Sequence, residues 1–254
     1  MVSIIIPTYN DTEEIGNIIK ECKKLSFDKE IIVVDDASNI QHKNILKKIK
    51  GIKLITQEKN TGKAGAMLNG FNHSNGSIIA FIDADIIGLT TKDLDNLIRP
   101  VLKNDYDITI SEKGSGLSRY GKYTGISATF TGERVFKRDI LERNKDLFKS
   151  HGYTIESEMN KRFLGTQKIA RVSWPNVKNP SKIRKGTFIG LKDDIKMYND
   201  IQKHIGLKEL SRQLEIANNL PVLNKENKTN MVENIKTNIK NNLGKLTLLR
   251  RKNL

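Results

Sequence analysis

The chain has 254 residues, of which 37% are hydrophobic, so it can bury the core of a large domain and is not a wholly disordered protein. Its 44 Lys and Arg residues against 29 Asp and Glu give a formal charge of +15. This excess favours anionic partners such as phosphates, nucleic acid or acidic lipid, although a composition bias towards Lys, Asn and Ile produces the same charge.

The cysteine content and the hydropathy of the chain indicate the cellular compartment in which it is expected. The single cysteine, Cys22, excludes an internal disulfide and suits a reducing compartment, and its place on the apolar face of an expected helix favours packing over chemistry. No stretch approaches the roughly 20 apolar residues that span a bilayer. The amino terminus also lacks a signal-peptide pattern, so we expect a cytoplasmic protein, free or at the inner face of the membrane.

The first 110 residues alternate between short β-branched runs and helical spacing. We expect strands over residues 3–6, 31–34, 52–55, 77–82 and 108–110. We expect helices over residues 15–22, 41–50, 64–72 and 94–101. Asp11 and Glu14 predict a capping box before the first helix, and Ile45, Leu46 and Ile49 predict the inner face of the second. Such alternation predicts an α/β fold, a mostly parallel sheet flanked by helices.

The character of the chain changes after residue 190. Apolar residues at helical spacing predict amphipathic helices, namely Ile195, Tyr198, Ile201, Leu207, Leu210 and Leu214. We therefore expect one domain over residues 1–190 and a helical extension over 191–254, with a linker near 218–229. The Gly- and Ser-rich stretch from Gly114 to Tyr123 is either a loop near the site or an ordinary surface loop.

Polar clusters follow several of the expected strands. They are Pro7 to Asn10, Asp35-Asp36, Asn60 to Lys63, and Asp83-Ala84-Asp85. Ligands bind at the carboxyl ends of the strands in open α/β sheets, so these clusters are expected to converge. Two carboxylates at the end of a buried strand suit a divalent cation that carries a diphosphate, whereas an acidic solvated turn is the simpler alternative.

Other nucleotide-binding folds are excluded by their missing loops. A dinucleotide-binding G-x-G-x-x-G is absent after the first strand, where Pro7 to Asn10 stand. Gly62-Lys63 lacks both the earlier glycine and the Ser or Thr of a Walker A loop. The glycine- and arginine-rich loop of sugar nucleotidyltransferases is missing as well.

Four segments carry a resemblance to a known family. They are Ile4-Ile5-Ile6-Pro7-Thr8-Tyr9-Asn10, Ile32-Val33-Val34-Asp35-Asp36-Ala37-Ser38, Asn60-Thr61-Gly62-Lys63-Ala64-Gly65-Ala66, and Asp83-Ala84-Asp85. With them the chain resembles a family 2 glycosyltransferase of the GT-A fold. Thr131 to Arg134 and Gly152 to Glu156 resemble the acceptor-side motifs of polyprenyl-phosphate sugar transferases and glucosyl-phosphoglycerate synthases. The resemblance implies metal-dependent, inverting transfer of a sugar from a nucleotide-sugar donor, with a lipid phosphate or another phosphorylated molecule as acceptor.

The resemblance implies a donor-side role for each matching position. Pro7, Thr8, Tyr9 and Asn10 would line the nucleoside pocket, followed by Asp11 where many relatives carry Glu. Asp36 would accept a hydrogen bond from the base, expected to be uracil, and Lys63 would lie near the base or the phosphates.

A metal site is implied by the same resemblance. Asp85 would ligate Mg²⁺ or Mn²⁺, while Asp83 would reach the ribose or sugar and is the second candidate ligand. Relatives often supply a late His ligand, and here Asn179 is the only candidate for a third ligand in that region. The bound metal would stabilise charge on the leaving diphosphate.

Acceptor-side candidates come later in the chain. Glu156 and Glu158 are candidates for the base, and on a helix they point about 200° apart, so only one faces the site; motif position favours Glu156. An acceptor that is already a phosphate needs no strong base, and Glu156 would then orient it. Glu133-Arg134 is expected to begin a helix whose amino terminus favours anions, so that Arg134 meets an acceptor phosphate or forms a surface ion pair.

The carboxyl-terminal segment is strongly basic. Residues 225–254 hold eight Lys or Arg and two Glu, a net charge of +6. Such a segment lies on an anionic membrane, forms a solvated tail, or is a helix that makes a homodimer. Two other functions remain open: a non-catalytic basic module that binds nucleic acid or membrane, and a retaining transferase that acts on a small phosphorylated acid. Asp83 and Asp85 argue against the non-catalytic module, and no nucleic-acid partner is expected.

Overall fold

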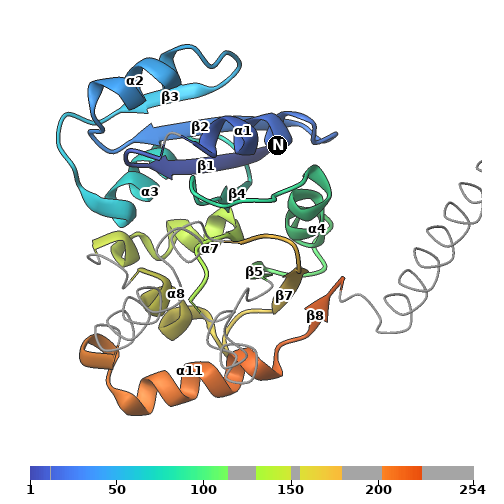
Figure 1. Cartoon of the computed structure of the whole chain (residues 1–254). Coiled ribbons are helices and arrows are strands. Elements are labelled where there is room, and N and C mark those ends of the chain that lie inside the picture. The colour runs from blue at the N-terminus through green and yellow to red at the C-terminus, as the bar shows by residue number, and fades with distance from the viewer. Residues whose placement is uncertain (12, 114–129, 150–154, 179–201, 225–254) are drawn as a thin grey trace, which may run out of the picture. The chain divides into compact units, whose positions relative to one another are not determined.

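The computed structural model describes residues 1–11, 13–113, 130–149, 155–178 and 202–224 (Figure 1). One compact unit runs from Met1 to Leu223. The loop from Gly114 to Tyr123, the candidate ligand Asn179 and the basic segment 225–254 lie outside the described residues, so what the sequence predicts for them stays a prediction. Within the described part of the chain, no helix is long and apolar enough to cross a membrane.

A single mixed sheet is the centre of the fold. In the described residues it has eight strands in the order β3-β2-β1-β4-β6-β5-β7-β8. The strands are β1 (Val2–Thr8), β2 (Lys29–Asp35), β3 (Lys53–Thr56), β4 (Ile78–Phe81), β5 (Ile108–Lys113), β6 (Arg134–Lys137), β7 (Ile169–Trp174) and β8 (Val222–Leu223). Neighbouring strands run parallel except at β6, which is antiparallel to both β4 and β5.

Alternate residues of the inner strands enter two separate cores. Ile4, Val33 and Ala80 pack on one face of the sheet, and their neighbours Ile5 and Ile32 pack on the other. The first face is covered by α1 (Ile15–Lys23), α2 (Ile40–Lys47) and α4 (Thr91–Leu102). The second is covered by α3 (Gly62–Asn72), α7 (Arg138–Glu142), the 3₁₀ helix Lys145–Lys149, α8 (Ile155–Phe163) and α11 (Leu207–Asn219) (Figure 1). Strands buried on both faces explain the continuous apolar runs of the sequence.

The expected α/β fold and its first five strands and four helices are confirmed, but two local predictions are wrong. Glu14 is the N-cap of α1 and its side chain makes no capping bond, because the helix begins at Ile15 and leaves Asp11 outside it. In α2 the buried positions are His42 and Leu46, one turn apart, and Ile45 lies on the exposed side. Cys22 is buried as expected, and burial raises the pKa of its thiol to about 12.

The carboxyl-terminal boundary also needs correction. The expected linker near 218–229 is wrong for residues 218–223, because α11 continues to Asn219 and β8 pairs in parallel with β7. The Arg171 side chain donates to the carbonyl of Asn218 and its backbone N–H to that of Pro221. Residues 207–223 therefore belong to the unit that holds the sheet, beyond the boundary expected at residue 190.

Two helical glycines make a matched test of this packing. A Cβ on Gly70 of α3 would overlap Ile5 Cγ2 of the sheet, whereas one on Gly16 of α1 would meet nothing within 4 Å. We expect Gly70→Ala to lower the free energy of unfolding by about 1–3 kcal/mol through overpacking. Gly16→Ala should raise it by up to about 1 kcal/mol, because alanine restricts the unfolded chain. Urea unfolding followed by circular dichroism measures both, and equal effects would contradict the packing of α3 on β1.

Candidate active site

The polar clusters converge where the order of the strands reverses. In the sheet β1 lies between β2 and β4, so the chain leaves β1 towards β2 and later returns on the other side with β4. Thr8 ends β1, Asp36 follows β2, and Asp83 and Asp85 follow β4. A crevice at the carboxyl ends of strands at such a point is the usual ligand site of open α/β sheets.

Lys63 joins the two sides of this site. Its Nζ lies 2.8 Å from Asp83 Oδ1 and 2.7 Å from Glu156 Oε1. Lys63 comes from the first turn of α3, Asp83 from the loop after β4 and Glu156 from α8. Burial works against the ammonium, but the charges of Asp83 and Glu156 outweigh it and raise the pKa of Lys63. The ion pairs therefore bring a donor-side residue and an acceptor-side residue to one cation.

Asp83 and Asp85 differ in their electrostatic surroundings. Burial would raise the pKa of Asp83, but the charges of Lys63 and Lys113 and a hydrogen bond from Lys63 hold it below its usual value. Burial, with the charge of Asp83 beside it, raises the pKa of Asp85 to about 6. Of the two, Asp85 is the carboxylate that has no ion pair in the described residues, and the charge of Lys113 offsets only part of the rise in its pKa.

The expected helix at Glu133-Arg134 is wrong. These residues lead into β6, which inserts antiparallel between β4 and β5. Glu133 is fully buried, accepts hydrogen bonds from Ser111 (2.8 Å) and Thr131 (2.5 Å), and forms an ion pair with Lys113 at 2.6 Å. The antiparallel entry of β6 therefore aims its first residues at the site, and no helix amino terminus is involved.

Arg134 is buried at the same edge. Its guanidinium donates to the carbonyl of Thr131 at 3.0 Å and to Asn160 Oδ1 at 2.7 Å. Burial lowers the pKa of Arg134 to about 10, although the charges of Glu156, Glu133 and Asp83 oppose that change. Its role towards an acceptor phosphate stays a prediction, whereas a surface ion pair is excluded by its burial.

Gly132 is a site residue that sequence reasoning passed over. A Cβ at this position would overlap Lys63 Nζ and both carboxylate oxygens of Asp83. A side chain here would therefore displace the ends of Lys63 and Asp83 from the positions in which they form their ion pair. The sequence offered one indication, because Gly132 lies directly before Glu133 within the motif Thr131 to Arg134.

Glu156 and Glu158 point to different surroundings, as their spacing on α8 predicts. Glu156 is buried against Lys63, whereas Glu158 lies 2.8 Å from His204 Nε2, away from the polar clusters. The geometry therefore leaves Glu156 as the better placed of the two candidates for the base.

Asp36 holds the turn that starts α3. Its carboxylate accepts from the backbone N–H groups of Thr61 (2.7 Å) and Gly62 (2.8 Å) and from the side chain of Gln57. These bonds satisfy free N–H groups at the helix start and fix the residue before Lys63. The contact of Asp36 with a base stays a prediction.

The remaining donor-side candidates surround the end of β1. Pro7 and Thr8 are buried within the strand, whereas Tyr9 is half exposed and Asn10 is exposed at the edge. The Asn10 side chain accepts from the backbone of Asn39 at 2.9 Å, which ties this end to the loop after β2. Asp11 is partly buried, and burial raises the pKa of its carboxyl.

The charges of the site fit a bound cation. Five carboxylates (Asp11, Asp83, Asp85, Glu133 and Glu156) share the electrostatic surroundings of three cations (Lys63, Lys113 and Arg134). No group of three or more His, Cys, Asp or Glu side chains is arranged around a metal position in the residues that the structure describes. Mg²⁺ and Mn²⁺ are usually held by one or two carboxylates, with substrate phosphates and water as the other ligands, so Asp85 with Asp83 suits them.

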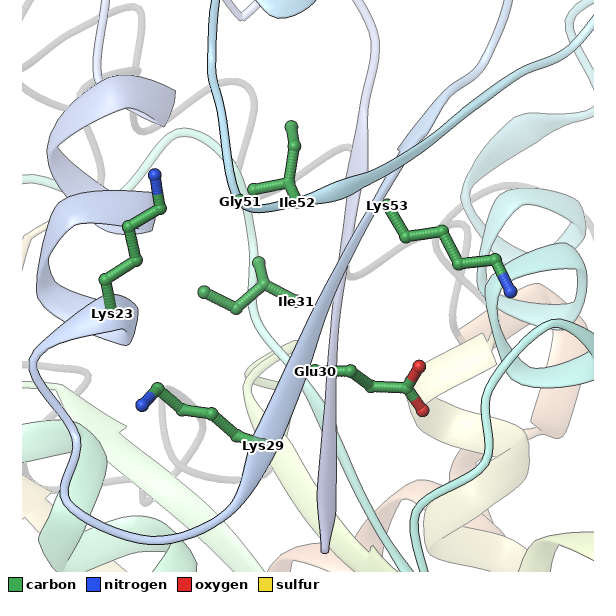
Figure 2. Close-up of a pocket in the computed structure, with 7 residues that line it drawn as sticks. All are labelled: Lys23, Lys29, Glu30, Ile31, Gly51, Ile52 and Lys53. Atoms are coloured by element: carbon green, nitrogen blue, oxygen red, sulfur yellow. The ribbon is translucent and has the colours of Figure 1, made fainter.

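A separate pocket lies at the opposite ends of the strands and carries no such chemistry. Figure 2 shows Lys23 and Lys29 beside Ile31 and Ile52, near the amino ends of β2 and β3. The Lys29 ammonium donates to the carbonyl of Leu25 at 2.6 Å, and Lys23 donates to that of Lys50. Both carbonyls lie just beyond the ends of α1 and α2, so the two lysines hold the loops that follow these helices and have a structural role.

Comparison with known proteins agrees with this arrangement. Residues 3–162 match Glycosyl transferase family 2. The chain belongs to this family. The matched segment includes every described candidate residue of the site.

Relatives of this family 2 chain act on phosphorylated acceptors, as their names state. It is 28% identical over 182 residues to poly(ribitol-phosphate) beta-N-acetylglucosaminyltransferase TarP of Staphylococcus aureus, covering 62% of this chain and 55% of TarP. It is 33% identical over 94 residues to undecaprenyl-phosphate 4-deoxy-4-formamido-L-arabinose transferase of Proteus mirabilis, covering 34% and 29%. The chain thus spans about half of the first relative and under a third of the second.

Solved structures share the GT-A fold. Glucosyl-3-phosphoglycerate synthase from Mycobacterium tuberculosis, crystallised with Mn²⁺, uridine diphosphate and glucosyl-3-phosphoglycerate, superposes with a TM-score of 0.60 over 85% of this chain and 80% of that one, at 19% identity. Residues 1–349 of TarS from S. aureus superpose with a TM-score of 0.55 over 68% and 60%, also at 19% identity. At these identities the likeness concerns the fold.

The raised pKa of Asp85 predicts a pH-dependent stability effect in metal-free protein. Its folded pKa of about 6 lies above the ordinary 3.8, so its ionisation opposes folding as pH rises through that interval and does not do so below about pH 4. Asp85→Asn should therefore raise the free energy of unfolding by about 1–2 kcal/mol at pH 7.5, allowing for partial exposure, and leave it unchanged at pH 4.

Urea unfolding in the presence of a chelator measures this effect. Asp95→Asn is the control, because Asp95 pairs with Arg99 on the outer side of α4 and is remote from the carboxylate group. A gain for Asp85→Asn that persists at pH 4, or no gain at pH 7.5, would contradict the electrostatic assignment.

Proposed function

We propose that this chain transfers a sugar from a uridine diphosphate sugar to a phosphorylated acceptor, with Mg²⁺ or Mn²⁺. The observation that carries the proposal is the pair of contacts that Lys63 makes with Asp83 and Glu156, because they bring the donor motif and the acceptor motif to one point. The donor class is supported by the fold shared with an enzyme crystallised with Mn²⁺ and uridine diphosphate. The acceptor class is supported by relatives named for poly(ribitol-phosphate) and undecaprenyl phosphate.

The residues of the chain divide the work of this reaction. Tyr9 and Asn10 emerge at the edge where a nucleoside would lie, and Asp83 beside Lys63 is placed for the sugar or ribose. Asp85 and Asp83 would hold the cation, which supplies positive charge to the leaving diphosphate. Lys63 provides a second positive charge at the same place, whether or not the acceptor is present.

Glu156 has two roles that depend on the acceptor. Towards an acceptor hydroxyl, its carboxylate takes the proton while the hydroxyl oxygen bonds to the anomeric carbon of the sugar and the bond from that carbon to the diphosphate breaks. A single displacement of this kind inverts the anomeric centre. An acceptor phosphate is already a nucleophile, so no proton needs to move. Glu156 would then hold the Lys63 ammonium in place, and Lys63 would orient the acceptor phosphate. Lys113 and Arg134 supply the positive charge that either phosphorylated acceptor requires.

The basic carboxyl-terminal segment favours a lipid phosphate as the acceptor, because such a segment binds the anionic membrane surface that presents it. A basic segment near an anionic surface is worth about 1 kcal/mol for each Lys or Arg close to it. The net charge of +6 over residues 225–254 would thus hold the chain at a membrane that presents the acceptor. Alternatively, the same segment forms a helix that pairs two copies of the chain. Sedimentation with anionic vesicles tests the membrane role, and analytical ultracentrifugation tests for the dimer.

The first test is nucleotide binding. We expect calorimetry to show that uridine diphosphate binds in the presence of Mn²⁺, and that a chelator or Asp85→Ala abolishes binding because the diphosphate then lacks its cation. Asp95→Ala should bind like the wild type. A screen of nucleotide sugars for donor hydrolysis identifies the sugar, because water replaces the unknown acceptor. No binding across a panel of nucleoside diphosphates would overturn the proposal.

The second test compares two glutamates of one helix. We expect Glu156→Gln to reduce turnover about 10²- to 10⁴-fold if the acceptor is a hydroxyl, with a small change in the donor KM. Glu158→Gln should keep wild-type turnover, since Glu158 contacts His204 outside the site. If the acceptor is a phosphate, Glu156→Gln should retain most of the turnover. Equal losses in both variants would contradict the role given to Glu156, and the anomer of the product reports inversion or retention.

A further inference from the structure

A buried polar cluster lies beneath the donor-side loops, and the reaction proposed above gives it no role. His42 of α2 and Asp35 at the end of β2 are both 0% exposed, and Thr8 at the end of β1 is 3% exposed. His42 Nε2 lies 3.0 Å from Thr8 Oγ1. At this depth each polar atom depends on the protein for its hydrogen bonds.

The hydrogen bond between His42 and Thr8 joins α2 to the end of β1, one residue before the exposed Tyr9. Burial lowers the pKa of His42, against the charges of Asp35 and Asp11. The neutral imidazole is therefore favoured, and one of its two ring nitrogens carries the proton.

This arrangement leaves two buried atoms unsatisfied. His42 Nδ1 and Asp35 Oδ2 have no hydrogen-bond partner among the described residues. Unpaired buried polar atoms oppose folding, and an apolar side chain in place of His42 would avoid part of that cost. A purely structural role therefore does not account for a histidine at this position.

The cluster closes a ring of contacts around the donor-side loop. The His42 backbone N–H donates to Asn39 Oδ1, and the Asn39 N–H donates to Asn10 Oδ1, both at 2.9 Å. The Asn10 N–H donates to Ser38 Oγ at 2.9 Å. Asn10 and Ala37 both have a φ of 61°, a conformation that non-glycine residues keep only when their surroundings enforce it.

We propose that His42 is a positioning residue of the donor pocket: its hydrogen bond to Thr8 Oγ1 fixes the end of β1 and thereby holds the loop from Tyr9 to Asp11 in the shape that receives a nucleoside diphosphate. The inference rests on the proposed function and assigns a specific residue to its donor side. His42 acts through Thr8 and does not itself reach the site.

Substitutions at both ends of the hydrogen bond test the proposal. We expect His42→Phe to weaken the binding of uridine diphosphate with Mn²⁺ about tenfold, the size of one buried hydrogen bond. His42→Gln should restore binding to within about threefold, because its side-chain amide replaces the imidazole in the hydrogen bond to Thr8 Oγ1. Thr8→Val should weaken binding to the same extent, and Thr8→Val with His42→Phe should weaken it no further, since both remove one interaction.

The controls separate positioning from general stability. His73→Phe changes an exposed histidine at the end of α3 and should leave binding unchanged. Because the loop prepares donor binding, the donor KM should rise in His42→Phe while kcat changes little. Unchanged affinity in folded His42→Phe, or additive losses in the double variant, would overturn the proposal.

A spectroscopic measurement keeps the inference independent of activity. Nitrogen-15 spectra of the imidazoles at pH 7, without nucleotide, should show a His42 Nε2 signal that shifts in Thr8→Val while the signals of His73 stay unchanged. An unchanged His42 Nε2 signal would overturn the proposal. Failure of every nucleoside diphosphate to bind the wild-type chain would instead refute the proposed function, and the spectra would still show whether the hydrogen bond to Thr8 exists.

Discussion

The ammonium of Lys63 lies between two carboxylates that are more than 70 residues apart in the sequence, Asp83 and Glu156, and the candidate site depends on it. Glu156 is buried, and Lys63 and Asp83 are partly buried, so each of these charges would oppose folding without the others. Several features of the fold serve this contact. Asp36 fixes the turn that carries Lys63, Gly132 leaves room beside it, and α8 brings Glu156 to meet it.

The carboxylates around Lys63 differ in how well their charges are compensated, and this difference indicates where a ligand would bind. Glu133 Oε2 accepts hydrogen bonds from Ser111 and Thr131, and its Oε1 forms an ion pair with Lys113. Asp85 has no such partner in the described residues, and burial beside Asp83 raises its pKa to about 6. Strongly perturbed groups of this kind mark functional sites, where a ligand completes the balance of charge. A divalent cation with a diphosphate has the charge and the ligand chemistry that this place lacks.

Two sets of contacts hold the donor side of the site: those of Asp36 with the start of α3, and those of α2 and the loop after β2 with the end of β1. Asp35 and Asp36 are adjacent, yet they serve different layers of the site. The Asp36 carboxylate caps α3, whereas that of Asp35 accepts from the Ser38 N–H at 3.1 Å and lies near His42. Hydrogen bonds from α2 and the loop after β2 to Asn10 and Thr8 make the edge of β1 rigid, which is what preorganised binding requires.

The sequence by itself determined the order of the first strands and helices, the convergence of Thr8, Asp36, Lys63 and Asp83, and the divergence of Glu156 from Glu158. These properties follow from periodicity and from strand ends, which are local. Only the tertiary structure decided that Glu133-Arg134 enters an antiparallel strand, that β8 extends the sheet, that His42 contacts Thr8, and that Gly132 lies beside Lys63 and Asp83. Each of these depends on partners distant in sequence, because strand pairing and the surroundings of a buried side chain are set by the packing of the whole sheet.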